Sequence, residues 1–180
     1  MTIWTARFAG FGLLTAFAVA VLLGVGLGGE RLRAQGASSQ TSSATKHTTV
    51  LFMCPHGAAK SVLASAYFQR LAKERGLNVR VDAVGTEPDE KVSPAVVEHL
   101  HKNGYEIPIA KPRAATAKDV NDADVVISLG CDITHLPATP RSLRNWNEVP
   151  APSDNFQAAD DAIRRRVVEL VEELVARQRK

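Results

Sequence analysis

Cys54 is the residue of this sequence that is best placed to act as a nucleophile. It directly follows an apolar run at residues 49–53, and the segment from Cys54 to Ser61 leads into a helical pattern. A loop that joins a strand to the start of a helix can turn its backbone N–H groups toward one anion, at the positive end of the helix dipole. The same dipoles stabilise a thiolate. We therefore expect Cys54 to be an anionic nucleophile beside an oxyanion-binding loop.

The residue types along the loop fit this chemistry. Gly57 can adopt a positive φ, and the small side chains of Ala58 and Ala59 allow the chain to curl around a tetrahedral oxyanion. Lys60 adds a positive charge, and the Ser61 hydroxyl can donate a hydrogen bond to the thiolate. The residues expected to bind the oxyanion are Pro55, His56, Gly57, Ala58, Ala59 and Lys60.

The alternative for Cys54 is an ordinary buried thiol at the end of a strand, which is the commonest fate of a free cysteine. Here the cysteine is combined with a strand, a glycine-containing turn, the pair Lys60 and Ser61, and the start of a helix. This combination favours the functional interpretation.

The elements that must position the loop alternate between strand and helix. Apolar runs predict strands at residues 49–53, 79–84, 125–129 and 143–149, with helical spacing between them and at the C-terminus. Such alternation implies a parallel sheet with right-handed crossovers and helices on both faces. We expect an α/β domain on a small four-stranded parallel sheet of order 2-1-3-4. Ligands of such sheets bind beyond the carboxyl ends of the strands, where Cys54 lies.

The sequence predicts three parts in the chain. Residues 1–34 contain an uncharged apolar run at residues 8–28, about as long as the roughly 20 residues that cross a bilayer as a helix. This apolar helix is either a cleaved signal peptide or a membrane anchor, and both place the protein outside the cytoplasm, in the periplasm or cell envelope. Residues 35–47 are small and polar and predict a flexible linker. Residues 48–180 form the α/β domain.

The composition excludes several other classes of protein. With 45% hydrophobic and 23% charged residues, the chain suits one domain with a sizeable core. The formal net charge is +3, but the segment before residue 35 carries most of the excess, so the domain has no nucleic-acid footprint. The two cysteines and the histidines lack the spacing of a metal site, and no cofactor is expected. The oligomeric state is left open.

In the order and spacing of these features the chain resembles the low-molecular-weight protein tyrosine phosphatases and their relatives, the thioredoxin-coupled arsenate reductases. The resemblance covers about residues 49–177. It rests on the loop with Cys54 and Ser61 and on three later segments, residues 84–86, 123–126 and 146–150. It implies that the thiolate attacks phosphorus or arsenic, that the loop amides hold the oxyanion, and that an aspartate in a late Asp-Pro loop protonates the leaving group.

Two positions depart from the family pattern. Lys60 stands in place of an arginine and lacks its two-pronged fork, which we expect to cost on the order of 10- to 100-fold in transition-state stabilisation. Val149 stands where the resemblance implies the acidic residue, and general acid catalysis typically contributes about 10²- to 10⁴-fold. Asp154 is the candidate proton donor, with helix capping as its alternative role. Glu148 and His56 are the other candidates.

Cys131 supports a rival interpretation. It follows the third predicted strand, so it is expected at the same sheet edge as Cys54, and a disulfide between them would suit an arsenate-reductase-type thiol oxidoreductase. Cys131 is displaced by one residue from the family's position, and Leu136 stands where a further cysteine is needed. Its alternative role is a small buried hydrophobe.

The sequence therefore predicts first a phosphatase-like enzyme that acts on phosphate monoesters such as phosphotyrosine. The arsenate-reductase-type activity, or a catalytically weak module that binds phosphate or an arsenate-like oxyanion, is the alternative. In the first case Cys54, Lys60, Ser61 and Asp154 are the catalytic residues.

Overall fold

The computed structural model describes residues 47–179. The predicted apolar helix within residues 1–34, and all of the predicted linker before His47, lie outside the described residues. Within residues 47–179 no helix combines the length and the apolar character needed to cross a bilayer.

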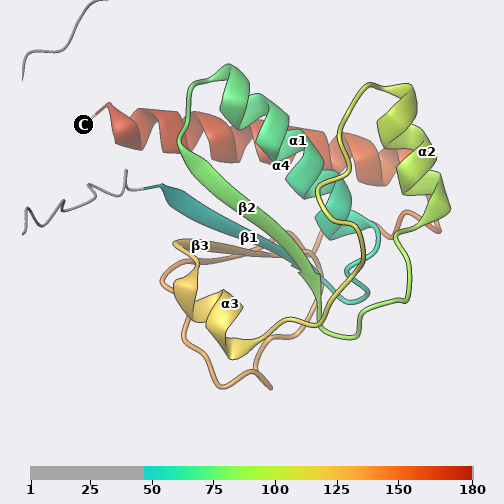
Figure 1. The fold of residues 1–180 in the computed structure, drawn as a ribbon, viewed down its shortest axis with the longest axis horizontal. Coiled ribbons are helices and arrows are strands. Elements are labelled where there is room, and N and C mark those ends of the chain that lie inside the picture. The colour runs from blue at the N-terminus through green and yellow to red at the C-terminus, as the bar shows by residue number, and fades with distance from the viewer. Residues whose placement is uncertain (1–46, 180) are drawn as a thin grey trace, which may run out of the picture. The chain divides into compact units, whose positions relative to one another are not determined.

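A four-stranded parallel sheet forms the centre of the fold (Figure 1). Its strand order is β2-β1-β3-β4, as the sequence predicts. The strands are β1 (Thr48–Cys54), β2 (Val79–Gly85), β3 (Val125–Ser128) and β4 (Leu143–Asn145). β1 and β2 pair along their whole length and end together, with Cys54 opposite Gly85.

The fourth strand is shorter than the predicted 143–149. The Trp146 amide still donates to the Ser128 carbonyl at 2.8 Å, but the Val149 amide turns back to the Trp146 carbonyl at 3.2 Å. Pro150 follows and has no amide to extend the ladder. The last residues of the predicted strand therefore form a turn at the carboxyl edge of the sheet.

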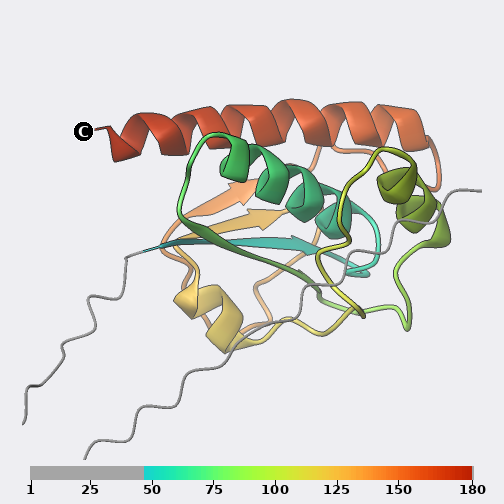
Figure 2. The same ribbon diagram turned by 45° about the horizontal axis from the view of Figure 1, so that its top comes forward.

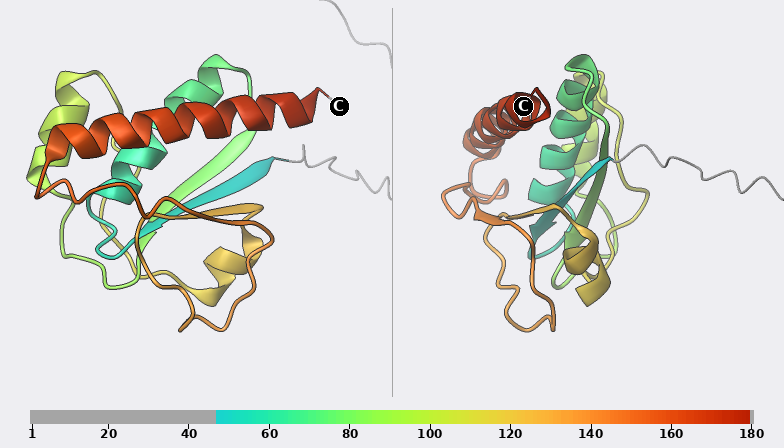
Figure 3. Two further views of the ribbon diagram at one scale, coloured as in Figure 1. Left: turned by 180° about the vertical axis from the view of Figure 1, so that it is seen from behind. Right: turned by 90° about the vertical axis from the view of Figure 1, so that its left-hand side faces the viewer.

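Helices cover both faces of the sheet, which confirms the predicted α/β class. The helices are α1 (Lys60–Glu74), α2 (Pro94–Lys102), α3 (Ala117–Asp122) and α4 (Phe156–Gln178). Figures 2 and 3 show α1 and α4 on one face and α3 on the other. Residues of α2 share the apolar core of the α1 and α4 face.

The alternation of side chains along β1 decides which residue faces which layer. Val50, Phe52 and Cys54 belong to the core beneath α1, α2 and α4, whereas Leu51 and Met53 belong to the smaller cluster beneath α3. All five are buried, as expected of the strand that has a partner on each side.

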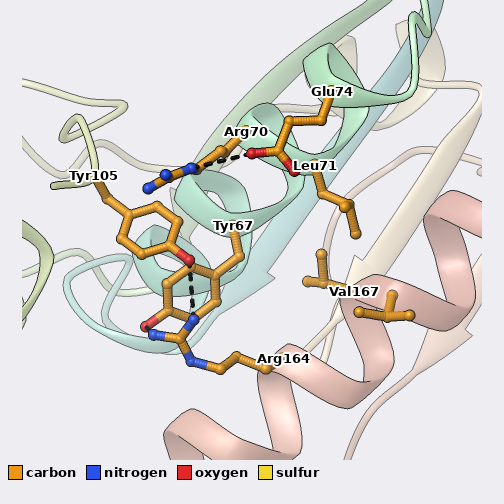
Figure 4. A pocket seen from close by; sticks show the side chains of 8 residues that line it. Tyr67, Arg70, Leu71, Glu74, Tyr105, Arg164 and Val167 are labelled. Carbon is orange, nitrogen blue, oxygen red and sulfur yellow. Dashed lines mark hydrogen bonds and ion pairs between the residues drawn. The ribbon is translucent and has the colours of Figure 1, made fainter. Parts of the chain in front are cut away.

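A partly buried polar cluster joins α1 to α4, and Figure 4 shows three of its members, Tyr67, Tyr105 and Arg164. The Arg164 guanidinium lies 4.0 Å from the centre of the Tyr67 ring and donates to Asp160 at 2.8 Å and to the Tyr105 hydroxyl at 2.9 Å. The Tyr67 hydroxyl also donates to Asp160. Burial, and then the Asp160 carboxylate, raise the pKa of Tyr67, so the phenol remains a donor. These bonds hold the first turns of α4 against α1.

A substitution in the aromatic core tests how α1 packs against the sheet. Phe68 is 0% exposed and makes an edge contact with Phe52, with ring centres 5.6 Å apart. We expect Phe68→Ala to lower the free energy of unfolding by about 3–5 kcal/mol, measured by urea denaturation. Val168→Ala on α4, where the side chain is 46% exposed, is the control and should change it far less. Equal effects would contradict the described packing.

Candidate functional site: the Cys54 loop

Hydrogen bonds to its carbonyl groups hold the loop between β1 and α1 against the connection between β2 and α2. Four of its carbonyls accept hydrogen bonds from amides in the connection between β2 and α2. The bonds are Thr86 to Cys54 at 3.3 Å, Glu87 to Pro55 at 2.8 Å, Asp89 to His56 at 3.0 Å and Ser93 to Ala58 at 2.9 Å. Because these carbonyls point toward the connection, the peptide N–H groups are left on the other side of the loop.

The amides of residues 56–62 donate to no backbone carbonyl within the described part of the chain. The start of α1 also lacks a side-chain cap and has no acidic residue in its first turn. Unpaired amides at the positive end of a helix are the usual binding groups for phosphate-like anions. The backbone geometry thus suits an oxyanion.

Two glycines allow the loop to fold this closely. Gly57 has a φ of +60°, and its backbone lies directly against Gly85 at the end of β2. A Cβ on Gly57 would lie 2.7 Å from the Gly85 nitrogen, and a Cβ on Gly85 would lie 2.7 Å from the Gly57 nitrogen. The sequence predicts the positive φ of Gly57, but it does not reveal that Gly85 is needed. The signals for it are a glycine just after a predicted strand and its place within residues 84–86, one of the segments on which the family resemblance rests.

Cys54 lies at the floor of a pocket. The residue is only 3% exposed, and it is one of the residues that line the pocket. Its Sγ is hydrogen bonded to the Ser61 Oγ at 3.2 Å, and Ser61 is fully buried. When the sulfur is a thiolate, the hydroxyl is the donor and stabilises the negative charge.

The pocket above Cys54 has a volume of about 410 Å³. The residues that line it are Cys54, Pro55, His56, Ala58, Ala59, Lys60, Asp89, Ser93, Ala95, Ala151, Pro152, Ser153 and Phe156. They come from the Cys54 loop and the start of α1, from the β2–α2 connection and the start of α2, and from the segment between β4 and α4 with the first residue of α4. Most of the predicted loop residues therefore line one pocket. The exceptions are Gly57, which packs against Gly85, and Ser61, which contacts the thiol.

Lys60 brings its positive charge to the side of this pocket. Its ammonium donates to the Val149 carbonyl at 3.4 Å. It also lies 3.3 Å from the point where a Cβ on Gly130 would stand. The Lys60 side chain thus links the start of α1 to two other segments, the residues just after β3 and the turn that contains Val149.

Of the three candidate proton donors, only His56 lines the pocket with Cys54. Asp154 is not among the residues that line the pocket, and its carboxylate accepts from the Ser153 hydroxyl at 3.1 Å. The alternative capping role of Asp154 is wrong, because the cap of α4 is Asn155, which accepts from the Ala158 amide. The role of Asp154 as an acid stays a prediction without geometric support.

Glu148 is engaged elsewhere. Its carboxylate pairs with Arg166 at 2.6 Å. Burial opposes its ionisation, but hydrogen bonds from the backbone and from Arg166 outweigh this and lower the pKa of Glu148. A carboxylate held ionised in this way is a poor proton donor at neutral pH.

Cys131 lies at the same edge of the sheet but on its other side. It packs against the cluster beneath α3, whereas Cys54 faces α1 and α4. Both thiols are free. Burial raises the pKa of Cys131, and the Ser128 hydroxyl 3.4 Å from its sulfur only partly offsets this effect. Cys54 also raises the pKa of Cys131 electrostatically, so the two thiols lie within range of each other. A disulfide between them stays a prediction.

The raised pKa of Cys131 predicts slow alkylation. In the Cys54→Ser variant, where Cys131 is the remaining cysteine, the iodoacetamide reaction should be slow at pH 7 because little thiolate is present. Its rate should grow roughly tenfold per pH unit until the pH passes the thiol's pKa, above the ordinary value of about 8.5. The unfolded chain in urea is the control. A plateau at lower pH than in urea would contradict the effect of burial.

Paired glycine substitutions test the loop geometry. Gly57→Ala should abolish phosphate binding measured by calorimetry, since the added Cβ meets the Gly85 backbone. Gly104→Ala is the matched control, because Gly104 has a similar φ of +68° with no atom within 4 Å. Both variants should lose about 1–2 kcal/mol from left-handed strain. Equal phosphate affinities of the two variants would contradict the role of the contact.

Comparisons with known proteins agree with this geometry. The profile of the family described as low molecular weight phosphotyrosine protein phosphatase matches residues 49–180. A Halobacterium salinarum protein, whose name proposes an arsenate reductase, is 29% identical over 136 residues, which cover 73% of this chain and 96% of that protein.

Two solved structures illustrate the range of relatives. The thioredoxin-dependent arsenate reductase of Corynebacterium glutamicum is 30% identical with a TM-score of 0.62, and the match covers 72% of this chain and 63% of that one. A low molecular weight phosphotyrosine phosphatase of Vibrio cholerae is 22% identical with a TM-score of 0.61, and the match covers 71% and 97%. The chain therefore belongs to the low molecular weight phosphotyrosine protein phosphatase family.

Proposed function

We propose that the protein hydrolyses phosphate monoesters through a covalent intermediate on Cys54. The observation that carries this proposal is the loop of unpaired amides at residues 56–62, which surrounds a pocket with the Cys54 thiol at its floor. A tetrahedral oxyanion bound by these amides would have its central atom next to the sulfur. Binding and nucleophilic attack thus use the same loop.

The reaction follows from the groups that line the pocket. The loop amides and the Lys60 ammonium neutralise the phosphate oxygens, and the Cys54 thiolate attacks phosphorus. The S–P bond forms as the P–O bond to the leaving group breaks. Ser61 stabilises the thiolate before attack and again when water hydrolyses the phosphocysteine and releases phosphate.

The pocket also supports a class of substrate. Phe156, Pro152, Ala95 and Ala151 supply apolar surface beside the loop, within a volume of about 410 Å³. An aromatic leaving group can pack there while the phosphate occupies the loop. Aryl phosphates, phosphotyrosine among them, are therefore the proposed substrates.

An arsenate-reductase-type activity is the second candidate, favoured by the similarity to the two arsenate-reductase relatives. It would use Cys131 as the redox partner of Cys54. Three features count against it: the thiols face opposite layers, burial raises the pKa of Cys131, and the chain has two cysteines in all. A module that binds phosphate or an arsenate-like oxyanion without turnover is the third candidate, favoured by Lys60 and Val149.

The place of action is also a proposal. The apolar run at residues 8–28 supports export from the cytoplasm or attachment to a membrane. A phosphatase with this arrangement would act in the periplasm or cell envelope. The proposal is independent of the chemistry at Cys54.

Hydrolysis of p-nitrophenyl phosphate tests the first candidate. Cys54→Ser should reduce kcat by more than about 10³-fold, because the covalent step is lost. Lys60→Arg should raise kcat/KM by about 10- to 100-fold if the arginine fork restores a second bond to the oxyanion. Cys131→Ser is the matched control and should leave both constants unchanged.

Other outcomes identify the alternatives. Arsenate-dependent consumption of a dithiol reductant that requires both Cys54 and Cys131 would establish the second candidate in place of the first. Phosphate binding by calorimetry in the absence of either activity would establish the third.

A further inference from the structure

We propose that His56 and Asp89 form the proton-donating pair of this site, with His56 as the acid that protonates the leaving group and Asp89 as the residue that positions it. The inference rests on the proposed phosphatase function and adds the group that this function lacks. It also assigns a role to Asp89, which lies on the β2–α2 connection, far from Cys54 in the sequence.

The pocket leaves few groups that could donate a proton. Asp154 does not line it, and Glu148 pairs with Arg166. Besides Cys54 and Lys60, the titratable residues that line the pocket are His56 and Asp89. Lys60 is bonded to the Val149 carbonyl and is needed as a charge on the oxyanion.

His56 and Asp89 are linked twice. The His56 Nδ1 lies 3.3 Å from the Asp89 Oδ1, and the Asp89 amide donates to the His56 carbonyl at 3.0 Å. The backbone bond fixes the two residues relative to the loop, and the carboxylate orients the ring through Nδ1. This arrangement leaves Nε2 as the nitrogen that can reach a substrate.

The pair lies at the mouth of the pocket, where a leaving group would emerge. Its side chains are 64% and 54% exposed, so bulk water can restore the proton after each turnover. On its other side His56 lines a second pocket. The charged or titratable residues that share the two pockets with His56 are Cys54, Lys60, Asp89, Glu87, Cys131, Asp132 and His135.

The proposed step balances without a further reactant. As the Cys54 thiolate forms the S–P bond, the P–O electron pair passes to the leaving oxygen, which takes the proton from His56 Nε2 and departs as a phenol or alcohol. The neutral imidazole then takes a proton from the water that attacks the phosphocysteine. Phosphate leaves, the thiolate is restored, and His56 is protonated again.

Leaving groups of different basicity give the test. p-Nitrophenolate leaves without a proton, whereas phenolate from phenyl phosphate needs one. His56→Gln should lower kcat/KM for phenyl phosphate by at least about 100-fold and for p-nitrophenyl phosphate by no more than about threefold. Asp89→Asn should give a smaller loss of about tenfold on phenyl phosphate, because the ring loses the carboxylate that orients it.

The control is His135→Gln, the histidine of the second pocket, which should behave as wild type on the two substrates. Asp154→Asn tests the competing acid, and the inference expects no loss in this variant that depends on the leaving group. The inference is overturned if His56→Gln affects both substrates equally or neither, or if Asp154→Asn shows the loss that depends on the leaving group. If the wild type shows no Cys54-dependent hydrolysis of p-nitrophenyl phosphate, the proposed function itself fails, and the inference with it.

Discussion

The contact between the Gly57 and Gly85 backbones is the constraint on which the site depends. The Cys54 loop has to cross the end of β2 at a distance that no Cβ permits on either residue. Because it does so, the carbonyls of the loop reach the amides of the β2–α2 connection, and the loop N–H groups are left for a ligand. The last pair of the β1–β2 ladder, Cys54 with Gly85, thus fixes the geometry of the anion site.

The second determinant is the face on which each thiol lies. Cys54 continues the alternation of Val50 and Phe52 and so faces α1, where its sulfur contacts the Ser61 hydroxyl. Cys131 has no helix start beside it and packs against the cluster beneath α3. Two cysteines at one edge of one sheet therefore lie in different surroundings.

Much of the fold and the position of the Cys54 loop can be predicted from the sequence because they depend on local patterns. Apolar runs and helical spacing predict the strands and the loop at Cys54, and the structure confirms the sheet. The end of β4 and the capping of α4 by Asn155 are local features that were not assigned from the sequence. The pairing of His56 with Asp89 depends on a contact between distant segments that no local pattern encodes. Gly85 is an example, because the sequence shows that the residue is a glycine but not that its backbone contacts Gly57.

The uncapped start of α1 has a consequence for the stability of the protein. The helix has neither a capping side chain nor an acidic residue in its first turn, so a bound oxyanion would itself serve as the cap. A ligand that binds the folded chain alone stabilises it by mass action, by about 2.7 kcal/mol at a concentration 100 times its dissociation constant. Phosphate that binds this loop would thus stabilise the folded chain in proportion to its concentration, and its removal would loosen the start of α1.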